Sequence, residues 1–196
     1  ALRTPLFLVQ AAGVSKPSMP LTAAKKLMNV ANPKDSGGMH GMLALHVGMR
    51  IHLLDALDEN KFLVKDAEGI VVRIEPHADD QQKMEDALRM GAGMVHLEKF
   101  PKGVWARMDK YAGAPFTKLS QDNDSTLLSA RTRNSVFIER RTADPFVCRE
   151  YTATRTGLPI SHARVITATA CQGRTMRDGV IIDCGRQEGG AHKKKQ

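Results

Sequence analysis

The sequence predicts a mixed α and β fold in which a small β-barrel is attached to a partial α/β element. Two observations predict the barrel: short apolar runs recur between residues 43 and 154, and polar turn residues separate them. A third observation predicts the α/β element, because the run Gly179–Cys184 is rich in β-branched residues, as buried parallel strands are. The 196 residues suffice for one domain of ordinary size or two small ones.

Residues 1–42 are expected to be poorly structured, because prolines and the run 32–38, rich in Gly and Pro, interrupt them. One helix is predicted between these breakers, from Thr22 as the N-cap to Val30. The clearest strand signal follows at Met49–Leu53, where apolar and polar residues alternate as they do in a half-buried strand.

A second strand is predicted over Ile70–Ile74, which is dense in β-branched residues. Together with the apolar run Phe62–Val64 it forms a predicted meander around a turn that contains Gly69. We expect Gly69 to have a positive φ, since it lies between two strand signals. The charged segment Asp79–Met90 predicts a short exposed helix or a long loop.

Further strands are predicted in the second half, at Val104–Met108, Ser135–Ile138 and Phe146–Tyr151. The tail that begins at Gly185 is rich in Gly and Lys, which predicts disorder. The predicted organisation is therefore a poorly structured segment at 1–42, the barrel at 43–154, the partial α/β element at 155–184 and a disordered basic tail at 185–196.

The positive charge is concentrated in the second half of the chain. The formal net charge is +8, with −1 in residues 1–98 and +9 in residues 99–196. This asymmetry favours a partner that carries phosphates, and the alternative is a basic domain without such a partner. Three widely spaced cysteines indicate an intracellular, reducing compartment, and no apolar run is long enough for a membrane span.

Common catalytic and metal-binding motifs are absent from the sequence. It contains no GxxxxGK[ST] phosphate loop, no HExxH, no CxxC and no GxSxG. His40, His46 and His52 are spaced by six residues and would share one side of a strand. This pattern fits either a metal site or histidines of a strand surface or core. The second interpretation is preferred, and Cys171 is interpreted as a small buried residue rather than a nucleophile.

The stretch Leu158–Met176 carries the strongest chemical signal. Small and apolar residues lead to compact hydrogen-bonding side chains, and Gly173 allows a sharp turn and a close approach to a ligand. Backbone amides near such a turn can meet phosphate oxygens. The alternative is a threonine-rich element packed in a core. The hydrogen-bonding side chains are Thr167, Thr169, Gln172 and Thr175.

This stretch resembles motif V of the Pif/RecD-like superfamily-1 DNA helicases. The match rests on Pro159, Ala163, Ile166, Thr167, Gln172, Gly173 and Thr175, followed by a strand at Val180–Asp183. A second stretch resembles the start of the SH3-like insertion of that family, over Leu45–Leu54 and Leu63–Val72. The two matches occur in the order and separation of the family. The sequence departs from the family at Thr169-Ala170-Cys171, where the family has His-Lys-Ser, and at Lys65-Asp66, where it has Asn-Gly.

The resemblance implies that the barrel is SH3-like, that the second element is part of a RecA-like domain, and that the motif V segment touches single-stranded DNA. Its residues would be Thr167, Thr169, Gln172 and Gly173, with Arg164 and Arg174 as phosphate contacts; Gln172 and Gly173 would also respond to the bound nucleotide.

In the family, ATP and Mg are the cofactors. The phosphate loop and the arginine-bearing motif VI are missing here, so no cofactor, no metal, no catalytic residue and no activity are expected for this chain alone. A longer chain would supply the remaining helicase lobe as a partner. The expected role is therefore the nucleic-acid-binding portion of an ATP-dependent DNA helicase, without sequence specificity.

The alternatives are a non-catalytic SH3-like protein-interaction module and an inactive helicase-derived fragment. Peptide grooves on such barrels need several aromatic side chains. Only Trp105, Tyr111 and Tyr151 could serve here, which favours nucleic acid.

Overall fold

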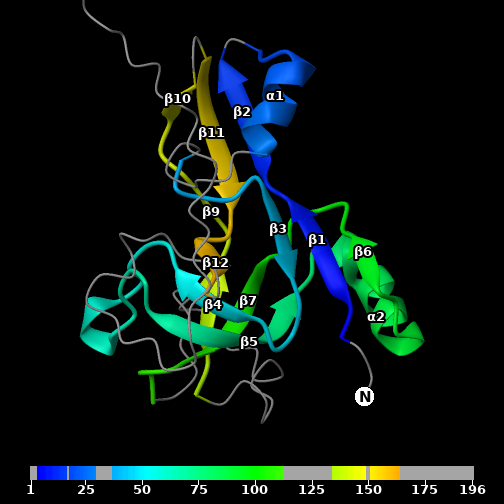
Figure 1. Cartoon of the computed structure of the whole chain (residues 1–196), viewed down its shortest axis with the longest axis vertical. Coiled ribbons are helices and arrows are strands. Elements are labelled where there is room, and N and C mark those ends of the chain that lie inside the picture. Colours follow the sequence, from blue (N-terminus) through cyan, green and yellow to red (C-terminus); the bar gives the residue numbers. More distant parts are fainter. Residues whose placement is uncertain (1–3, 17, 30–36, 113–133, 149–150, 164–196) are drawn as a thin grey trace, which may run out of the picture. The chain divides into compact units, whose positions relative to one another are not determined.

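The computed structural model describes residues 4–16, 18–29, 37–112, 134–148 and 151–163. The chain divides into two units, residues 1–165 and 166–196, and every described residue belongs to the first. The described part consists mostly of strands with two α-helices, α1 (Leu21–Met28) and α2 (Gln81–Met90), which confirms the mixed α and β class (Figure 1). Neither helix has the length and apolar character that crossing a membrane requires.

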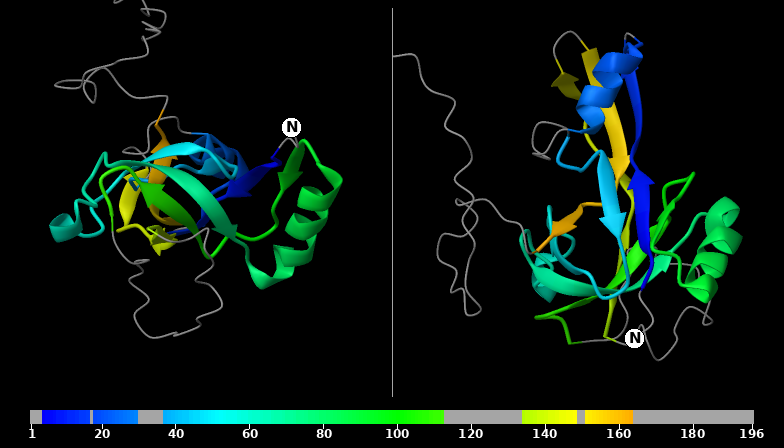
Figure 2. Two further views of the ribbon diagram at one scale, coloured as in Figure 1. Left: turned by 90° about the horizontal axis from the view of Figure 1, so that it is seen from below. Right: turned by 45° about the vertical axis from the view of Figure 1, so that its right-hand side comes forward.

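The largest sheet has five antiparallel strands. Their order is β12 (Ile160–His162), β4 (Arg50–Leu53), β5 (Glu68–Glu75), β7 (Gly103–Met108) and β8 (Val136–Glu139). The register of β5 against β7 shifts between Val71 and Arg73, and such a bulge bends a strand (Figure 2). A closed barrel requires the two edge strands to pair. Among the described residues the short edge strands β12 and β8 each pair on one side, so the sheet is open and the predicted closed barrel is not found.

Two smaller sheets complete the strand pairing. One has the order β3 (Met42–Leu45), β1 (Leu6–Gln10) and β6 (Met94–His96), with β1 antiparallel to β3 and parallel to β6. The other has the order β10 (Phe146–Cys148), β11 (Tyr151–Gly157) and β2 (Ala12–Lys16), and β9 (Arg141–Thr142) also pairs with β11. Short 3-10 turns lie at Glu59–Lys61 (η2) and Ala78–Asp80 (η3).

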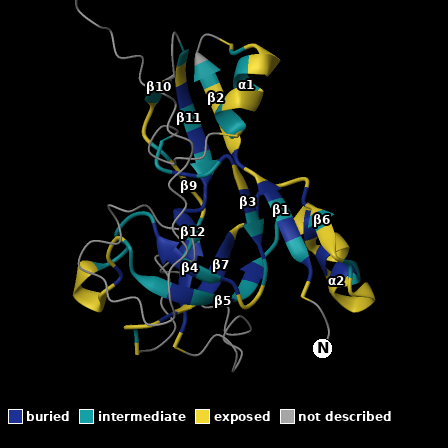
Figure 3. Cartoon of the chain, viewed as in Figure 1, coloured by how far each residue is buried: buried dark blue, intermediate teal, exposed yellow. Residues whose placement is uncertain are grey.

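One apolar cluster joins the three-stranded and five-stranded sheets. Phe7, Val9 and Leu45 come from the first sheet, and α2 contributes Met84 and Ala87. The five-stranded sheet contributes the largest share, including Ile51, Leu53, Val71, Ile74, Val104, Ala106, Ile138 and Ile160. None of the described residues of β2, β9, β10 or β11 belongs to this cluster. β11 nevertheless has buried positions of its own (Figure 3).

The first 42 residues contain more regular structure than the sequence predicts. They include β1, β2 and α1, and the side chains of Phe7 and Val9 are buried. The predicted helix exists, but it begins at Leu21 and Thr22 is not its N-cap. Pro20 occupies the cap position with a φ of −58°. The fixed φ of proline suits the start of a helix, so this breaker marks a boundary and does not exclude the element.

The predicted meander is correct in β4 and β5 but wrong between them. Phe62–Val64 does not form a strand; it follows η2, and only an isolated bridge joins Asp58 to Leu63. The positive φ expected at Gly69 is at Asp66 instead, with a φ of 63°, in a turn where the Ala67 amide donates to the Val64 carbonyl.

Gly69 lies inside β5 and needs space rather than a special φ. A Cβ built on it would lie 2.7 Å from the carbonyl oxygen of Arg107 on the neighbouring strand β7.

Some of the remaining predicted elements are confirmed, one is corrected, and others lie outside the described residues. The predicted strands at Val104–Met108 and Ser135–Ile138 correspond to β7 and β8, and the helix within Asp79–Met90 is α2. The single strand predicted over Phe146–Tyr151 is instead two strands, because Cys148 of β10 pairs with Tyr151 of β11. The predicted strand at Gly179–Cys184 and the tail at 185–196 lie outside the described residues.

Candidate functional site

All six residues predicted to contact nucleic acid lie outside the described part of the chain. They are Arg164, Thr167, Thr169, Gln172, Gly173 and Arg174, and they remain sequence-based predictions. The structure does describe the beginning of the motif V-like stretch, up to Ala163, and this part forms strand β12.

The structure places the two helicase-like stretches side by side. Strand β12 from the motif V-like stretch pairs with β4 from the insertion-like stretch, with Ile160 opposite Leu53 and Ser161 opposite His52. Backbone hydrogen bonds extend the pairing at both ends, from the Leu54 amide to the Pro159 carbonyl (2.8 Å) and from the Ala163 amide to the Arg50 carbonyl (3.1 Å). The chain therefore leaves the described part, toward residue 164, from an anchored edge strand.

The residues of the insertion-like stretch have structural roles that explain their identity. Gly48 has a φ of 91°, which favours glycine, and its amide donates to the Val71 carbonyl at 2.7 Å. Met49, Ile51 and Leu53 are buried in the main apolar cluster.

Arg50 of the same stretch connects β4 to β5 and to Asp109, the residue that follows β7. Its guanidinium donates to both carboxylate oxygens of Asp109, at 2.9 and 2.8 Å, and to Glu68 at 2.8 Å. These partners, Asp109 first, raise the pKa of Arg50 above its ordinary value. Because the side chain remains about one-third exposed, the ion pairs are screened by solvent and stabilise the fold only modestly.

His40 lies near two histidines of the paired strands β4 and β12, His52 and His162. The ring Nε2 of His40 lies 2.8 Å from the Ser161 hydroxyl. The pKa of His40 is lowered, first by burial and then by the charges of His162, His52 and Arg155. Burial also lowers the pKa of His162. Among the described residues no group of three His, Cys, Asp or Glu side chains is placed to hold a metal ion. His40 and His162 are partly buried, and His52 is buried.

Arg155 is the most deeply buried cation in the described part of the chain. Its side chain is 2% exposed, and its two terminal nitrogens donate to the carbonyls of Met39 (3.0 Å) and Leu27 (2.8 Å). Leu27 lies in the last turn of α1, where carbonyls lack intrahelical donors and the helix dipole favours a cation. Arg155 thereby connects β11 to the C-terminal end of α1 and to the segment that carries His40.

The described residues carry little of the excess positive charge. They include 16 Lys and Arg against 14 Asp and Glu. Six of these cations also form ion pairs with described carboxylates: Arg50, Lys61, Arg73, Lys83, Arg89 and Arg141. The basic character that predicts a phosphate-bearing partner therefore belongs mainly to sequence outside the described ranges.

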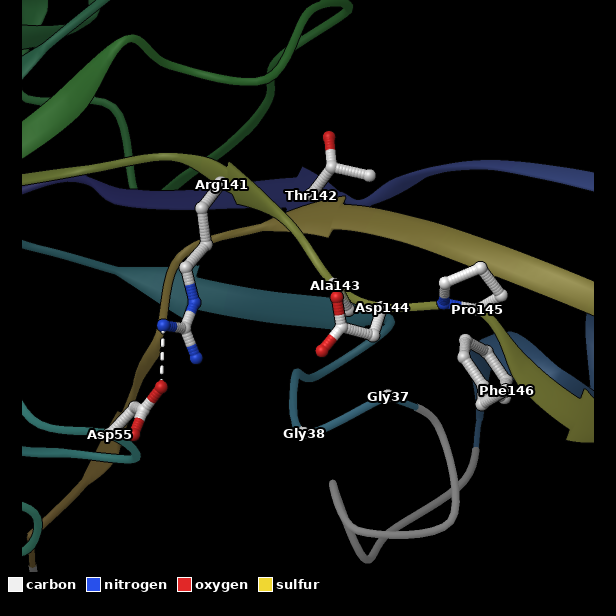
Figure 4. A pocket seen from close by; sticks show the side chains of 9 residues that line it. All are labelled: Gly37, Gly38, Asp55, Arg141, Thr142, Ala143, Asp144, Pro145 and Phe146. Atoms are coloured by element: carbon white, nitrogen blue, oxygen red, sulfur yellow. Dashed lines mark ion pairs between the residues drawn. The ribbon is translucent and has the colours of Figure 1, made fainter.

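A cavity of about 500 Å³ opens where β9 and β10 face the turn at Gly37 and Gly38. Figure 4 shows the Arg141 guanidinium and the Asp144 carboxylate extending from the 141–146 segment toward this turn. Arg141 reaches Asp55 at 2.6 Å. No sequence signal predicts this site, because Gly37 and Gly38 resemble chain breakers and no motif includes Arg141 or Asp144.

The aromatic residues that a peptide groove would need do not share one surface. Trp105 is 4% exposed, packs against Phe137 with ring centroids 5.1 Å apart, and donates from Nε1 to Glu75 at 3.1 Å. Tyr111 packs against the main cluster and Tyr151 belongs to β11 in another sheet. Because these three side chains lie apart, they form no aromatic groove among the described residues that could bind a peptide, as the protein-interaction alternative requires.

Comparisons with known proteins gave matches in solved structures alone. No protein-family model and no curated protein matches the chain. A Pif1 helicase from Candida albicans is similar over 86% of this chain and 32% of its own, at 17% identity and a TM-score of 0.43. An unliganded Pif1 from Bacteroides sp is similar over 86% of this chain and 36% of its own, at 18% identity and a TM-score of 0.39.

A third structure, described as two coordinating Pif1 helicases that unwind forked double-stranded DNA, is similar over 86% of this chain and 25% of its own, at 19% identity and a TM-score of 0.40. The chain thus spans between a quarter and little more than a third of the length of these solved proteins. At such identities and TM-scores the similarity by itself assigns no function to this chain.

Proposed function

We propose that this chain is the nucleic-acid-binding portion of an ATP-dependent DNA helicase and that it grips single-stranded DNA without sequence specificity. The observation that carries the proposal is the pairing of β4 with β12, which makes neighbours of the two stretches that resemble the same helicase family. The two stretches are separated by more than 100 residues in the sequence. A chance resemblance of two unrelated segments would not require them to meet in one sheet.

The proposed grip uses the residues that follow β12. Arg164 and Arg174 contact phosphates, while Thr167, Thr169, Gln172 and Gly173 contact the strand at the turn. Phosphate contacts supply affinity that is independent of sequence and sensitive to salt. The role of the described part is to anchor this segment, through the β4–β12 hydrogen bonds and the buried side chains of Leu158 and Ile160.

ATP hydrolysis is not part of the proposal for these 196 residues. Phosphoryl transfer needs a cradle for the phosphates and a metal ligand beside the charge-stabilising arginine. The sequence has no GxxxxGK[ST] loop to supply the cradle. No step through a nucleotide is therefore assigned to the residues of this chain.

The test measures binding of a fluorescent oligothymidine to the whole chain by anisotropy at two salt concentrations. Neutralising about three phosphates gives a slope of log K against log salt of about −2 for a single strand. The double variant Arg164→Ala, Arg174→Ala should lower affinity and flatten this slope. Its control is Lys61→Ala, Arg89→Ala, which removes the same charge from two cations that already form ion pairs.

Equal losses in both double variants would attribute binding to net charge alone. No binding at low salt by folded protein would refute the proposal and favour the protein-interaction module.

A further inference from the structure

The C-terminal end of β12 is weakly anchored compared with its beginning. Ile160 is completely buried, whereas Ser161 and His162 are only partly buried. Among the described residues β12 pairs with β4 alone, and the Ala163 amide, which donates to the Arg50 carbonyl, marks the end of this pairing. Edge segments of this kind can open locally while the rest of the domain stays folded.

His40 contacts this end of β12 from a segment that is itself held in place. Its ring Nε2 lies 2.8 Å from the Ser161 hydroxyl. The preceding residue, Met39, is completely buried, and its carbonyl accepts from the Arg155 guanidinium at 3.0 Å. Separation of His40 from Ser161 therefore requires β12 to move rather than the segment that carries His40.

The charged and titratable groups that act on His40 come from three strands. They are His162 of β12, His52 of β4 and Arg155 of β11, and together with burial they lower the pKa of His40. Arg155 carries a permanent positive charge, and each histidine becomes positive when it binds a proton. A protonated His40 would therefore be a partly buried cation beside other cations.

His162 responds to acid less directly than His40. Burial lowers its pKa, and His46 acts in the same direction, whereas a hydrogen bond with the backbone of Ala44 raises it. The Ala44 backbone thus stabilises a charge on His162 in the folded protein, so the main response is expected from His40.

The sign of the response follows from the two states of the β12 end. When β12 is paired, the pKa of His40 lies below its ordinary value near 6.5. When the end of β12 separates, water reaches the ring and the pKa returns toward that value. The open state therefore binds the proton more readily, and opening increases below pH 6.5, by up to about tenfold per pH unit for each proton bound.

We propose that mild acid, by protonating His40, releases residues 161–163 from β4 and thereby weakens the grip of the protein on single-stranded DNA. The proposal rests on the proposed function, since it adds a regulation of the segment that follows β12. The beginning of the strand stays in place, because Leu158 and Ile160 are buried and the Leu54 amide donates to the Pro159 carbonyl at 2.8 Å.

The test measures hydrogen exchange of single amides by NMR in the whole chain, without DNA, at pH 7.5 and 5.5. After correction for intrinsic exchange, the protection of the Ala163 amide should fall about tenfold in acid. The Leu54 amide, at the other end of the same pairing, should keep its protection and report that the sheet is folded.

Two variants identify the titrating group. His40→Gln can still donate to the Ser161 hydroxyl but carries no charge, so the protection of Ala163 should be the same at both pH values. His96→Gln, at an exposed position of β6, should respond like the unmodified chain. Unchanged protection of Ala163 in acid, an equal loss at Leu54, or a response that His40→Gln retains would overturn the proposal.

A second readout compares the affinity for a fluorescent oligothymidine at the same two pH values and constant salt. Protonated histidines add positive charge, so electrostatics alone predicts tighter binding in acid. Release of β12 predicts several-fold weaker binding in acid, which His40→Gln should remove. Tighter or unchanged binding in acid would overturn the regulation of the grip. No binding at either pH would refute the proposed function alone, because the exchange measurement contains no DNA.

Discussion

The five-stranded and four-stranded sheets are stabilised in different ways. The five-stranded sheet buries aliphatic side chains from β4, β5, β7 and β8 in one cluster. The four-stranded sheet exposes the valines Val14 and Val147 and buries Arg155, whose guanidinium donates to backbone carbonyls. The stability of the five-stranded sheet therefore depends on buried apolar area, which many substitutions reduce only slightly. The stability of the four-stranded sheet depends on a few directional hydrogen bonds, which a single substitution can remove.

The largest effect is expected at Arg155. Arg155→Met removes charge-assisted hydrogen bonds to two carbonyls, one of them at the C-terminal end of α1, and should lower the free energy of unfolding by about 3–5 kcal/mol. The measurement is the urea midpoint of unfolding. Arg107→Met, at an exposed position of β7, is the control and should change stability by less than about 0.5 kcal/mol. Similar midpoints for both variants would mean that the four-stranded sheet does not depend on this guanidinium.

A smaller loss of stability is expected when a Cβ is added at Gly69 in the five-stranded sheet. The Cβ of Gly69→Ala would approach the backbone of Arg107 to 2.7 Å, and the cost should be about 1–3 kcal/mol. Gly93→Ala enters open space and should be neutral or slightly stabilising.

Gly69→Asn separates the two reasons for a glycine at this position. Asparagine tolerates a positive φ but has the same Cβ, so thermal unfolding should show it to be no milder than alanine. A milder effect of asparagine would restore the turn that the sequence analysis placed at Gly69.

The junction of β4 and β12 should be sensitive to acid. Burial and neighbouring cations lower the pKa of folded His40 below its ordinary value near 6.5. The unfolded chain therefore binds more protons in the window below pH 6.5, and stability should fall as the pH falls through it. Melting temperatures at pH 7.5 and 5.5 measure the effect. His40→Gln should reduce the difference, and His96→Gln, at an exposed position of β6, should not. An unchanged difference in His40→Gln would assign the acid sensitivity to other groups.

The smallest expected effect is a gain in stability at Phe62. This side chain is 66% exposed and has a φ of 59°, which is strained for an aromatic residue. Phe62→Gly should relieve the strain and, after the entropy of glycine, stabilise the protein by about 0.5 kcal/mol. Phe62→Ala keeps the strained backbone and serves as the control. A gain in the alanine variant as well would show that exposure of the ring, and not its backbone conformation, is unfavourable.

The difference between the five-stranded and four-stranded sheets also explains which strands can be predicted from the sequence. Alternation at Met49–Leu53 and β-branched residues at Ile70–Ile74 predicted β4 and β5, because these strands place apolar side chains in the core. β11 has the sequence YTATRTG, in which a buried arginine replaces the apolar residue that alternation would reveal. Pairing between β2 and β11 was not predictable, since it depends on partners that are far apart in the sequence.

The two candidate sites, the motif V-like residues and the cavity at Arg141 and Asp144, also differ in how strongly the sequence marks them. The motif V-like residues are marked in the sequence by small and hydroxyl side chains around a glycine, and their role stays a prediction because residues 164–176 lie outside the described part of the chain. The cavity at Arg141 and Asp144 gave no signal, because its walls come from three separate segments and two of its residues are glycines without side chains.

The pairing of β2 with β11 also has a consequence for how the protein folds. Lys16 is the partner of Thr152, and this contact closes a loop of more than 130 residues before its hydrogen bonds can form. Loop closure of this kind costs conformational entropy early, and folding slows as contacts become more distant in sequence. On the ribosome, β2 leaves the exit tunnel long before its partner is synthesised, and its open edge is exposed to neighbouring chains throughout that interval.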